Sequence, residues 1–268
     1  MANTTILAPT WRRHTCIDRV VPPDLQPALH VARRVAETRA RALLTASRSA
    51  ATLRAEDIVR AKMAVVSGRK WEDGQKVRCR FMDGSAKQRK RTEAKAHMWE
   101  EFANIKLVFG NDKDAEVRIS FGFDEGSWSA VGTECLVAAY FPKHQPTMNF
   151  GWLKDDTSDR EYQRVVVHEF GHALGCIHEH QSPTEHLHWN KKAVYAAFSG
   201  PPNYWSKDDI DDNILKKYSP KGIAASAFDI DSIMLYQFDA SLFTDHKATP
   251  QNYALSKQDK TFIGTMYP

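Results

Sequence analysis

Short segments in the middle of the chain alternate polar and apolar residues, which is the pattern of strands with one buried face. Lys76–Phe81 alternates along its whole length. In Glu116–Phe121, the residues Val117, Ile119 and Phe121 fall on one face. The other segments predicted to form strands are Ile105–Phe109, Leu136–Phe141 and Met148–Trp152. Together these segments predict a sheet.

Other segments are typical of helices. Ala86–Phe102 is predicted to form one helix, which ends in an aromatic cluster. Ser158, with Glu161 three residues later, has the pattern of a capping box. The helix that begins there continues into His168 and is predicted to end near Gly175, because glycine is favoured just past a helix end. Shorter helices are predicted to begin at Asn190, Ser206 and Ser256.

The order of these elements predicts an α+β protein. A strand, a helix, several strands, a long helix and a looser C-terminal part are typical of two lobes with a cleft between them. Upstream of the first strand, Leu29–Val66 is rich in Ala and Arg, which favours helix. Turn-forming residues at 67–74 then mark a boundary. We therefore expect a basic helical leader or pro-segment at residues 1–70 and one folded domain at residues 71–268.

The formal net charge of +4 conceals an uneven distribution. Residues 1–70 carry 13 Lys or Arg and 5 Asp or Glu, whereas residues 71–268 carry 24 and 28. Such a leader is typical of a pro-segment, a targeting segment, a polyanion-binding arm or a solvated helical extension, and composition leaves all four open. The first residues lack the apolar core of a secretory signal, so we expect a cytoplasmic protein or export by a non-standard route.

The strongest chemical signal lies in the segment 168–178. His168 and His172 are four residues apart, so on a helix their imidazoles lie about 40° apart on one face and can reach one ion. Gly175 allows a sharp turn that brings His178 back as a third ligand. Three protein ligands leave one position open to water, as in catalytic zinc sites. Glu169 can take a proton from that water and pass it to a leaving amine.

This segment resembles the zinc motif of the metzincin class of peptidases, in which a methionine turn follows later in the chain. Ser232–Tyr236 fits such a turn, and the resemblance implies that Met234 packs beneath the metal and is not a ligand. Two details resemble the astacin family within this class. Glu179 follows the third histidine directly, and Tyr236 stands two residues after the methionine.

The resemblance covers about residues 71–268, and Pro146–Trp152 and His178–Pro183 are most similar to astacin-like peptidases of bacteria and fungi. It implies a metzincin-like two-lobed fold, with a mixed twisted sheet and the metal-binding helix in the N-terminal lobe and a looser C-terminal lobe. It also implies one zinc ion per chain. The implied metal ligands are His168, His172, His178 and Tyr236. The implied catalytic residues are Glu169 and Tyr236, the tyrosine moving toward the oxyanion during turnover.

The leading hypothesis is therefore a zinc-dependent endopeptidase that hydrolyses internal peptide bonds with metal-activated water. An alternative is a catalytically weak protein that uses the zinc scaffold for binding, which loss of Glu169 would have favoured. A third is nucleic-acid or membrane-surface association through the basic leader. We expect a monomer that acts on proteins or peptides, with no nucleic-acid partner and, since no run of about 18 apolar residues occurs, no membrane span.

The four cysteines match no zinc-knuckle spacing, and the expectation for each is a buried free thiol. Cys79 shares its register with Val77 and Phe81, so it is expected to face the core. The leader shows no recognisable inhibitory aspartate or cysteine context. Cys16 nevertheless belongs to a small apolar patch, with Ile17 and Val20–Val21, that is capable of docking on the domain.

Histidines and a tryptophan outside the motif receive less specific interpretations. His180, His186 and His188 are expected on the rim or in loops, because the ligand spacing is already filled. Trp128 either forms a wall of the substrate cleft beside a sheet edge or is an ordinary buried tryptophan.

Overall fold

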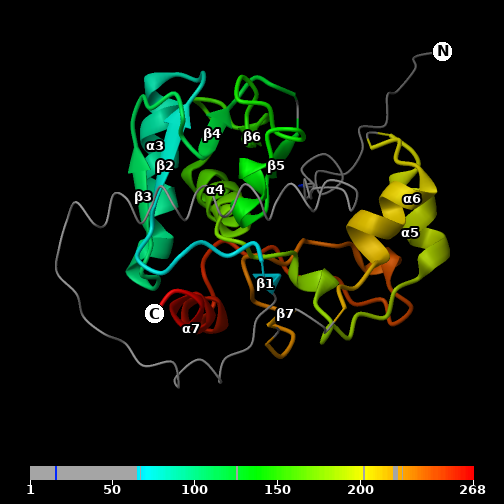
Figure 1. The fold of residues 1–268 in the computed structure, drawn as a ribbon. Helices are drawn as coiled ribbons and strands as arrows, with labels where there is room; N and C mark the ends of the chain where they lie inside the picture. Colours follow the sequence, from blue (N-terminus) through cyan, green and yellow to red (C-terminus); the bar gives the residue numbers. More distant parts are fainter. Residues whose placement is uncertain are drawn as a thin grey trace, which may run out of the picture.

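The computed structural model describes residues 16, 65–66, 68–124, 126–201, 203–219, 223–224 and 226–268. The helix predicted at Leu29–Val66 lies almost entirely outside these ranges. The sheet and α3 (Ala86–Ala96) lie on one side of α4 (Asp159–Ala173), whereas α5 and α6 belong to a separate lobe (Figure 1). None of the helices in the described ranges has the length and apolar composition of a membrane span.

The main sheet has five strands in the order β3-β2-β4-β6-β5. These strands are β2 (Lys76–Phe81), β3 (Lys106–Phe109), β4 (Val117–Ser120), β5 (Ser127–Ser129) and β6 (Met148–Phe150). β5 is antiparallel to β6 at one edge, and the other strands are parallel. The mixed sheet confirms the predicted α+β class, and β2 has the predicted bounds. β5 is a strand that the alternation pattern does not predict.

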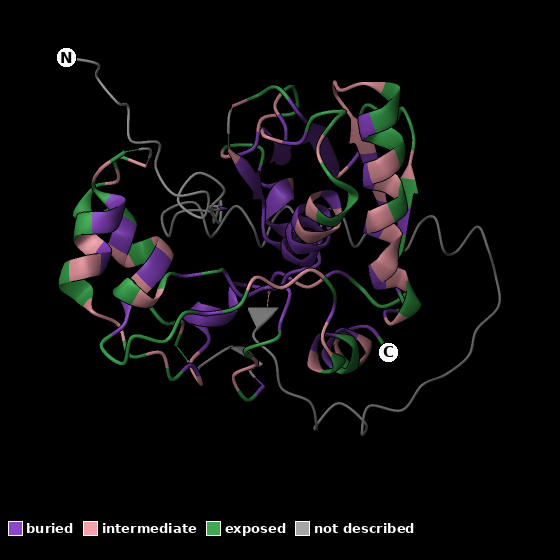
Figure 2. Ribbon diagram, turned by 180° about the vertical axis from the view of Figure 1, so that it is seen from behind, coloured by how far each residue is buried: buried purple, intermediate pink, exposed green. Residues whose placement is uncertain are grey.

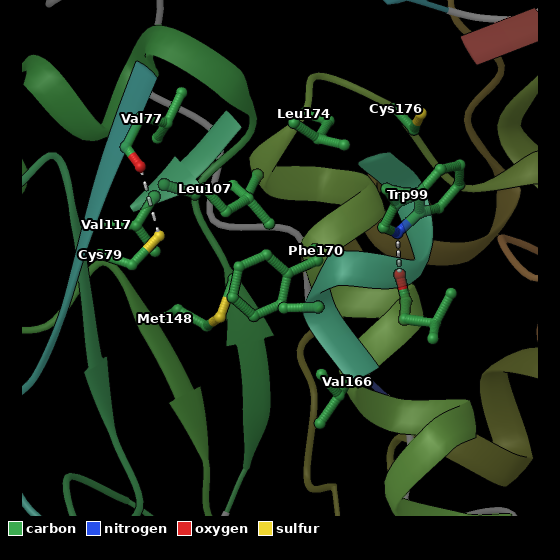
Figure 3. Packing of buried hydrophobic residues seen from close by; sticks show 14 of the residues in the cluster. Val77, Cys79, Trp99, Leu107, Val117, Met148, Val166, Phe170, Leu174 and Cys176 are labelled. Carbon is green, nitrogen blue, oxygen red and sulfur yellow. Dashed lines mark hydrogen bonds between the residues drawn. The ribbon is translucent and has the colours of Figure 1, made fainter. Parts of the chain in front are cut away.

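The helix α4 packs against this sheet through an apolar face. Its second half is buried, as Figure 2 shows in purple. Phe170 points toward Leu107 and Met148 of the sheet (Figure 3). From the other side, the Trp99 indole donates a hydrogen bond of 2.9 Å to the carbonyl of Val167. The helix that carries the histidine motif is therefore held from both sides.

Two helix predictions need adjustment. The predicted helix Ala86–Phe102 is α-helical only to Ala96 and continues as the 3-10 helix η2 (His97–Glu101). At the start of α4, Ser158 accepts a hydrogen bond of 3.2 Å from the backbone N–H of Glu161, as predicted. The Glu161 carboxylate does not complete the capping box, because it binds side chains farther along α4 and in the preceding loop.

The C-terminal part contributes to two cores. Its helical elements are α5 (Lys191–Phe198), α6 (Lys207–Ile210), the π-helix η5 (Asp211–Leu215), the 3-10 helix η6 (Ala240–Leu242) and α7 (Lys257–Met266). The elements α5, α6 and η5 build a second core, whereas the buried residues of α7 join the core of the sheet and α4. Asn190, Ser206 and Ser256 cap α5, α6 and α7 as predicted. Phe198 and Phe238 belong to an apolar cluster of this lobe that also contains Tyr236.

The strand predicted at Leu136–Phe141 is wrong. Residues Gly132–Leu136 form the 3-10 helix η3, and turns follow. The buried guanidinium of Arg118 reaches this segment, donating 3.0 Å to the carbonyl of Phe141 and 2.7 Å to that of Gln145. Within the segment, Tyr140 and Phe141 donate their backbone N–H groups to the carbonyl of Val137, as in a turn.

Residues just before the domain also pack against it. β1 (Val65–Val66) pairs antiparallel with β7 (Ile223–Ala224). Arg69 Nε lies 2.8 Å from the carboxylate of Glu134, and both side chains are buried. The Arg69 backbone carbonyl accepts a hydrogen bond of 2.9 Å from Thr133 N–H. The boundary between residues 70 and 71 stays a prediction, and these contacts come from residues on the leader side of it.

Candidate metal centre

Three buried imidazoles meet beside α4. The Nε2 atoms of His168 and His172 are 3.1 Å apart, as are those of His172 and His178. Nitrogen ligands about 2.0–2.1 Å from a tetrahedral zinc ion lie roughly 3.3 Å from one another. The predicted three-histidine set therefore comes together with the spacing that such an ion requires.

Backbone carbonyls orient two of these rings. His168 Nδ1 lies 2.8 Å from the carbonyl of Ile233, and His172 Nδ1 lies 2.9 Å from that of Cys176. An Nδ1 that donates to a carbonyl leaves Nε2 as the unprotonated nitrogen, which is the form that binds metals. Burial, reinforced by the neighbouring His172 and His178, holds the pKa of His168 well below its usual range.

Gly175 makes the turn that the motif predicts. Its φ is +97°, a left-handed conformation that a residue with a Cβ rarely adopts. The turn is closed by a hydrogen bond of 2.9 Å from Cys176 N–H to the carbonyl of Gly171. It returns the chain so that His178 faces the two histidines of α4.

Met234 packs beneath the helix, as the resemblance implies. It is fully buried, and a Cβ added to Gly171 would clash with its sulfur. The turn around Met234 is held from α7, where the Asp259 carboxylate accepts 2.7 Å from Ser232 Oγ and 2.9 Å from Ile233 N–H. The methionine thus packs against Gly171, next to His172 on α4, and its exclusion from the ligand set stays a prediction.

The two predicted catalytic side chains also lie at this site. Glu169 is 1 % exposed and follows the first histidine on α4. The ring centroid of Tyr236 is 4.2 Å from that of His178 and 5.6 Å from that of His168. Glu169 and Tyr236 share one partner, because both bind Cys16.

Cys16 is the site residue that sequence reasoning missed. Its Sγ donates to Glu169 Oε2 at 3.1 Å, and its backbone carbonyl accepts a hydrogen bond from the Tyr236 hydroxyl. The thiol and one nitrogen of each of the three histidines lie within 4.8 Å of one another. Only the apolar patch around Cys16 signalled that this part of the leader docks on the domain. All four cysteines are free and buried, as predicted.

The donor set fits zinc. Three imidazole nitrogens and a thiol sulfur are the ligands that zinc prefers in proteins, whereas calcium and magnesium take oxygen. With Cys16 in place, four possible donors lie within 4.8 Å of one another. With Cys16 withdrawn, three histidines remain and one position opens to water or substrate.

One prediction about the remaining histidines is wrong. His180 is buried, not on the rim: its ring lies 5.1 Å from that of His178 and 4.9 Å from that of Tyr236. Aromatic residues of the C-terminal lobe, such as Phe238, enclose its other side. His186 and His188 are exposed, as predicted. The pattern of the sequence could not separate these three, because the aromatic partners of His180 come from distant segments.

Trp128 follows the second of its two interpretations. Its side chain is 2 % exposed within β5, and its indole donates 3.0 Å to the Asp124 carboxylate. The strand itself contacts α4 at the edge of the sheet.

Comparisons with known proteins agree with this geometry. A family model described as Matrixin matches residues 70–199. One solved structure of myroilysin is 42 % identical, covers 76 % of this chain and 98 % of its own, and has a TM-score of 0.73. A crystal structure of myroilysin is 36 % identical, covering 82 % and 99 %, with a TM-score of 0.59.

A hatching enzyme zinc-protease of the medaka fish Oryzias latipes, high choriolytic enzyme 1, is 17 % identical over 75 % of this chain and 95 % of its own, with a TM-score of 0.48. No curated protein matches the chain. The long match to myroilysin, the Matrixin model and the three-histidine site all indicate the same class. The chain belongs to the metzincin zinc metalloendopeptidases, which bind one catalytic zinc ion.

Proposed function

We propose that the chain is a latent form of this peptidase, in which Glu169 is the general base and Cys16 blocks the catalytic groups. The observation that carries the proposal is the placement of Cys16 on Glu169, on Tyr236 and beside the three histidines. His168, His172 and His178 are the proposed zinc ligands, and protein or peptide chains are the substrates of the class.

Zinc held by His168, His172 and His178 would supply a Lewis acid that polarises a carbonyl and makes water more acidic. The Glu169 carboxylate takes a proton from the attacking water and delivers it to the nitrogen of the leaving amine. Its position next to His168 on α4 keeps it beside the reacting atoms. Burial of the carboxylate removes competing water and strengthens its interaction with the proton that moves.

The Tyr236 hydroxyl is the proposed donor to the oxygen that becomes negative when the carbonyl is attacked. A fixed donor aimed at a developing charge lowers the barrier without reorganisation at the moment of reaction. The ring packs against the rings of both His178 and His180, at centroid distances of 4.2 and 4.9 Å. Its hydroxyl is occupied by the carbonyl of Cys16, so it becomes available only when the leader leaves.

Latency follows from two contacts of one residue. The thiol of Cys16 occupies the carboxylate that must accept a proton, and its carbonyl occupies the phenol that must donate a hydrogen bond. Cys16 also lines the pocket at the site, where a substrate has to enter. Of the four interpretations of the leader, this geometry favours the pro-segment. The alternative of a zinc-scaffold binding protein is not favoured, because Glu169 is present at the site.

The test compares the full chain with its Cys16→Ser variant on a peptide library derived from a proteome. We expect zinc-dependent cleavage that rises at least about tenfold in the variant, because loss of the thiol removes its contact with Glu169 and its affinity for zinc, so the leader leaves the site more readily. A chelator should abolish cleavage in both. Equal activity of the two proteins would contradict latency, and absence of chelator-sensitive cleavage in both would contradict the peptidase assignment.

A further inference from the structure

His180 is a buried imidazole that the proposed mechanism does not use. It belongs to the 3-10 helix η4 (Glu179–Gln181), just past His178, and it is 1 % exposed. Among the described residues, the possible donors gathered at the metal centre are those of Cys16 and the three predicted histidine ligands, without His180. Nor does His180 line the pocket at the site. It is therefore placed neither to bind the metal nor to meet a substrate.

The backbone that carries His180 is attached on both sides. Glu179 N–H donates a hydrogen bond of 3.0 Å to the carbonyl of Met234 in the methionine turn. The side-chain amide of Gln181 donates 2.7 Å to the carbonyl of Asp212 in η5. The helix η4 thus joins the methionine turn to the second core, and His180 lies between the two attachments.

A hydrogen bond also orients the His180 ring. Its Nε2 lies 3.1 Å from the backbone carbonyl of Asn213 in η5. Because a carbonyl accepts and cannot donate, Nε2 carries the proton in this hydrogen bond. Rotation of the ring would break the bond, so the plane of the imidazole is set from η5.

The oriented ring packs against two rings of the site. Its centroid is 5.1 Å from that of His178, with 26° between the ring planes, and 4.9 Å from that of Tyr236, with 31°. Phe238 and Trp189 meet His180 edge-on, at 5.0 and 6.3 Å. These separations lie in the range of roughly 4.5–7 Å in which aromatic rings attract one another. His180 therefore connects the second core with the Tyr236 phenol.

Ring packing becomes important for Tyr236 when the leader leaves. In the proposed latent chain, the carbonyl of Cys16 holds the phenol hydroxyl. In the proposed active form that partner is gone, and the hydroxyl must still come within about 2.7–3.1 Å of the developing oxyanion. A group displaced by about 1 Å loses much of its catalytic effect. A neighbouring ring that is itself tied to the backbone is suited to keep the phenol in place.

We propose that His180 is a positioning residue, which holds the Tyr236 phenol at the angle from which its hydroxyl reaches the oxyanion. The inference rests on the proposed function and adds a residue to it. Since His180 acts through Tyr236, its removal should matter only while the Tyr236 hydroxyl is present. The same phenol donates to the Cys16 carbonyl in the latent chain, so His180 should also help to retain the leader.

A double-mutant cycle in the zinc-loaded full chain with Cys16→Ser tests the catalytic consequence. His180→Ala should lower kcat for peptide cleavage by about fivefold and change KM less, because a transition-state contact weakens. In the Tyr236→Phe background the same substitution should lower kcat by less than about twofold. Release of the leader would raise cleavage, so it cannot account for a fall in kcat. His186→Ala is the matched control, because His186 is exposed, and it should leave kcat unchanged in both backgrounds.

His180→Phe is the second variant, in case the fold does not tolerate loss of the ring. It keeps an aromatic contact with Tyr236 and removes the hydrogen bond to Asn213. We expect the same pattern at a smaller size, with kcat about twofold lower beside Tyr236 and unchanged in the Tyr236→Phe background.

The consequence for the leader is measured without activity, on the zinc-free chain with Cys16 intact. Alkylation of each cysteine by a maleimide is followed by mass spectrometry. His180→Ala should raise the alkylation rate of Cys16 by about threefold, the size of one weakened hydrogen bond, and should raise it no further in the Tyr236→Phe background. Cys79 and Cys135 are buried in the core of the sheet and α4, so they report general loosening and should keep their rates.

The outcomes separate the two proposals. If His180→Ala lowers kcat by one factor in both backgrounds, or speeds alkylation of all cysteines alike, His180 is merely structural and the positioning role is overturned, while the peptidase stands. Loss of zinc from this variant would also overturn it, because the residue would then act through His178. If the parent with Cys16→Ser cuts no peptide in a zinc-dependent manner, the proposed function fails, and alkylation still decides whether His180 positions Tyr236.

Discussion

On the α4 side of the metal centre, backbone geometry fixes the imidazoles, whereas on the C-terminal side, packing between rings holds the tyrosine. His168 and His172 are placed by helix periodicity, and Gly175 turns the chain to bring in His178. Tyr236 instead lies in an aromatic cluster assembled from distant segments. Changes on the first side should therefore alter metal binding and stability together, and changes to Tyr236 should alter turnover alone.

The largest effect is expected from Glu169→Gln, introduced into the Cys16→Ser full chain. Zinc should stay bound, since the histidines keep their backbone supports, while kcat/KM should fall by about a thousandfold as base catalysis is lost. Elemental analysis and peptide cleavage together check this. Near-normal turnover would show that another group acts as the base.

Arg69→Met tests the contacts of Arg69 with the turn at Gly175, which leads from His172 to His178. A Cβ on Gly132 would meet the Arg69 carbonyl and lie 3.2 Å from Gly175 Cα, so these three residues are in close contact. Removing Arg69 from the buried Glu134 should cost about 3 kcal/mol of unfolding free energy.

The double variant Arg69→Met, Glu134→Gln should recover part of this loss in denaturant unfolding. Lys143→Met is the matched control, because its ion pair with Asp114 is exposed and should contribute less than about 1 kcal/mol. If Arg69→Met is as mild as the control, residues before 71 are dispensable for the fold, as the predicted boundary requires.

Gly171→Ala tests the packing between α4 and the methionine turn. The added methyl group would clash with Met234 and lie 3.0 Å from Trp99, and both neighbours are buried. We expect a loss of about 2 kcal/mol in unfolding free energy and weaker zinc retention. Gly110→Ala is the control, because no atom lies within 4 Å of the new Cβ. A steric clash should therefore alter neither its unfolding free energy nor its zinc retention.

The smallest effect is expected from Tyr236→Phe. The ring keeps its contacts with His178, His180 and Phe238, so stability and zinc content should not change. Loss of the hydroxyl should lower kcat by about tenfold while KM changes less, as for an interaction made mainly in the transition state. A rise in KM with constant kcat would make Tyr236 a substrate contact instead.

Local signals in the sequence were sufficient for the parts of the fold that depend on periodicity or on caps. The alternation in Lys76–Phe81, the cap at Ser158 and the spacing of His168 and His172 each depend on neighbours within a few residues. The resemblance to astacin-like peptidases added the two-lobed fold, which the match to myroilysin confirms.

The remaining features depend on partners far apart in the chain. Leu136–Phe141 forms turns in place of a strand, and the distant Arg118 binds the carbonyl of Phe141 at its end. His180 is buried because Phe238 and Trp189 cover it. Cys16 reaches Glu169 across more than half of the sequence, and no spacing rule connects them. Long-range packing of this kind leaves no periodic trace in a single sequence.

The proposed block by Cys16 also has a consequence for how inhibition would depend on protein concentration. As long as residues 17–64 join Cys16 covalently to the domain, the proposed block would be intramolecular and insensitive to dilution. After a single cut in that segment, the same contacts must be made between two molecules, and their occupancy falls as the solution is diluted. Proteolysis of the leader would thus convert a concentration-independent inhibitor into a weak, dilutable one without altering any atom of the metal centre.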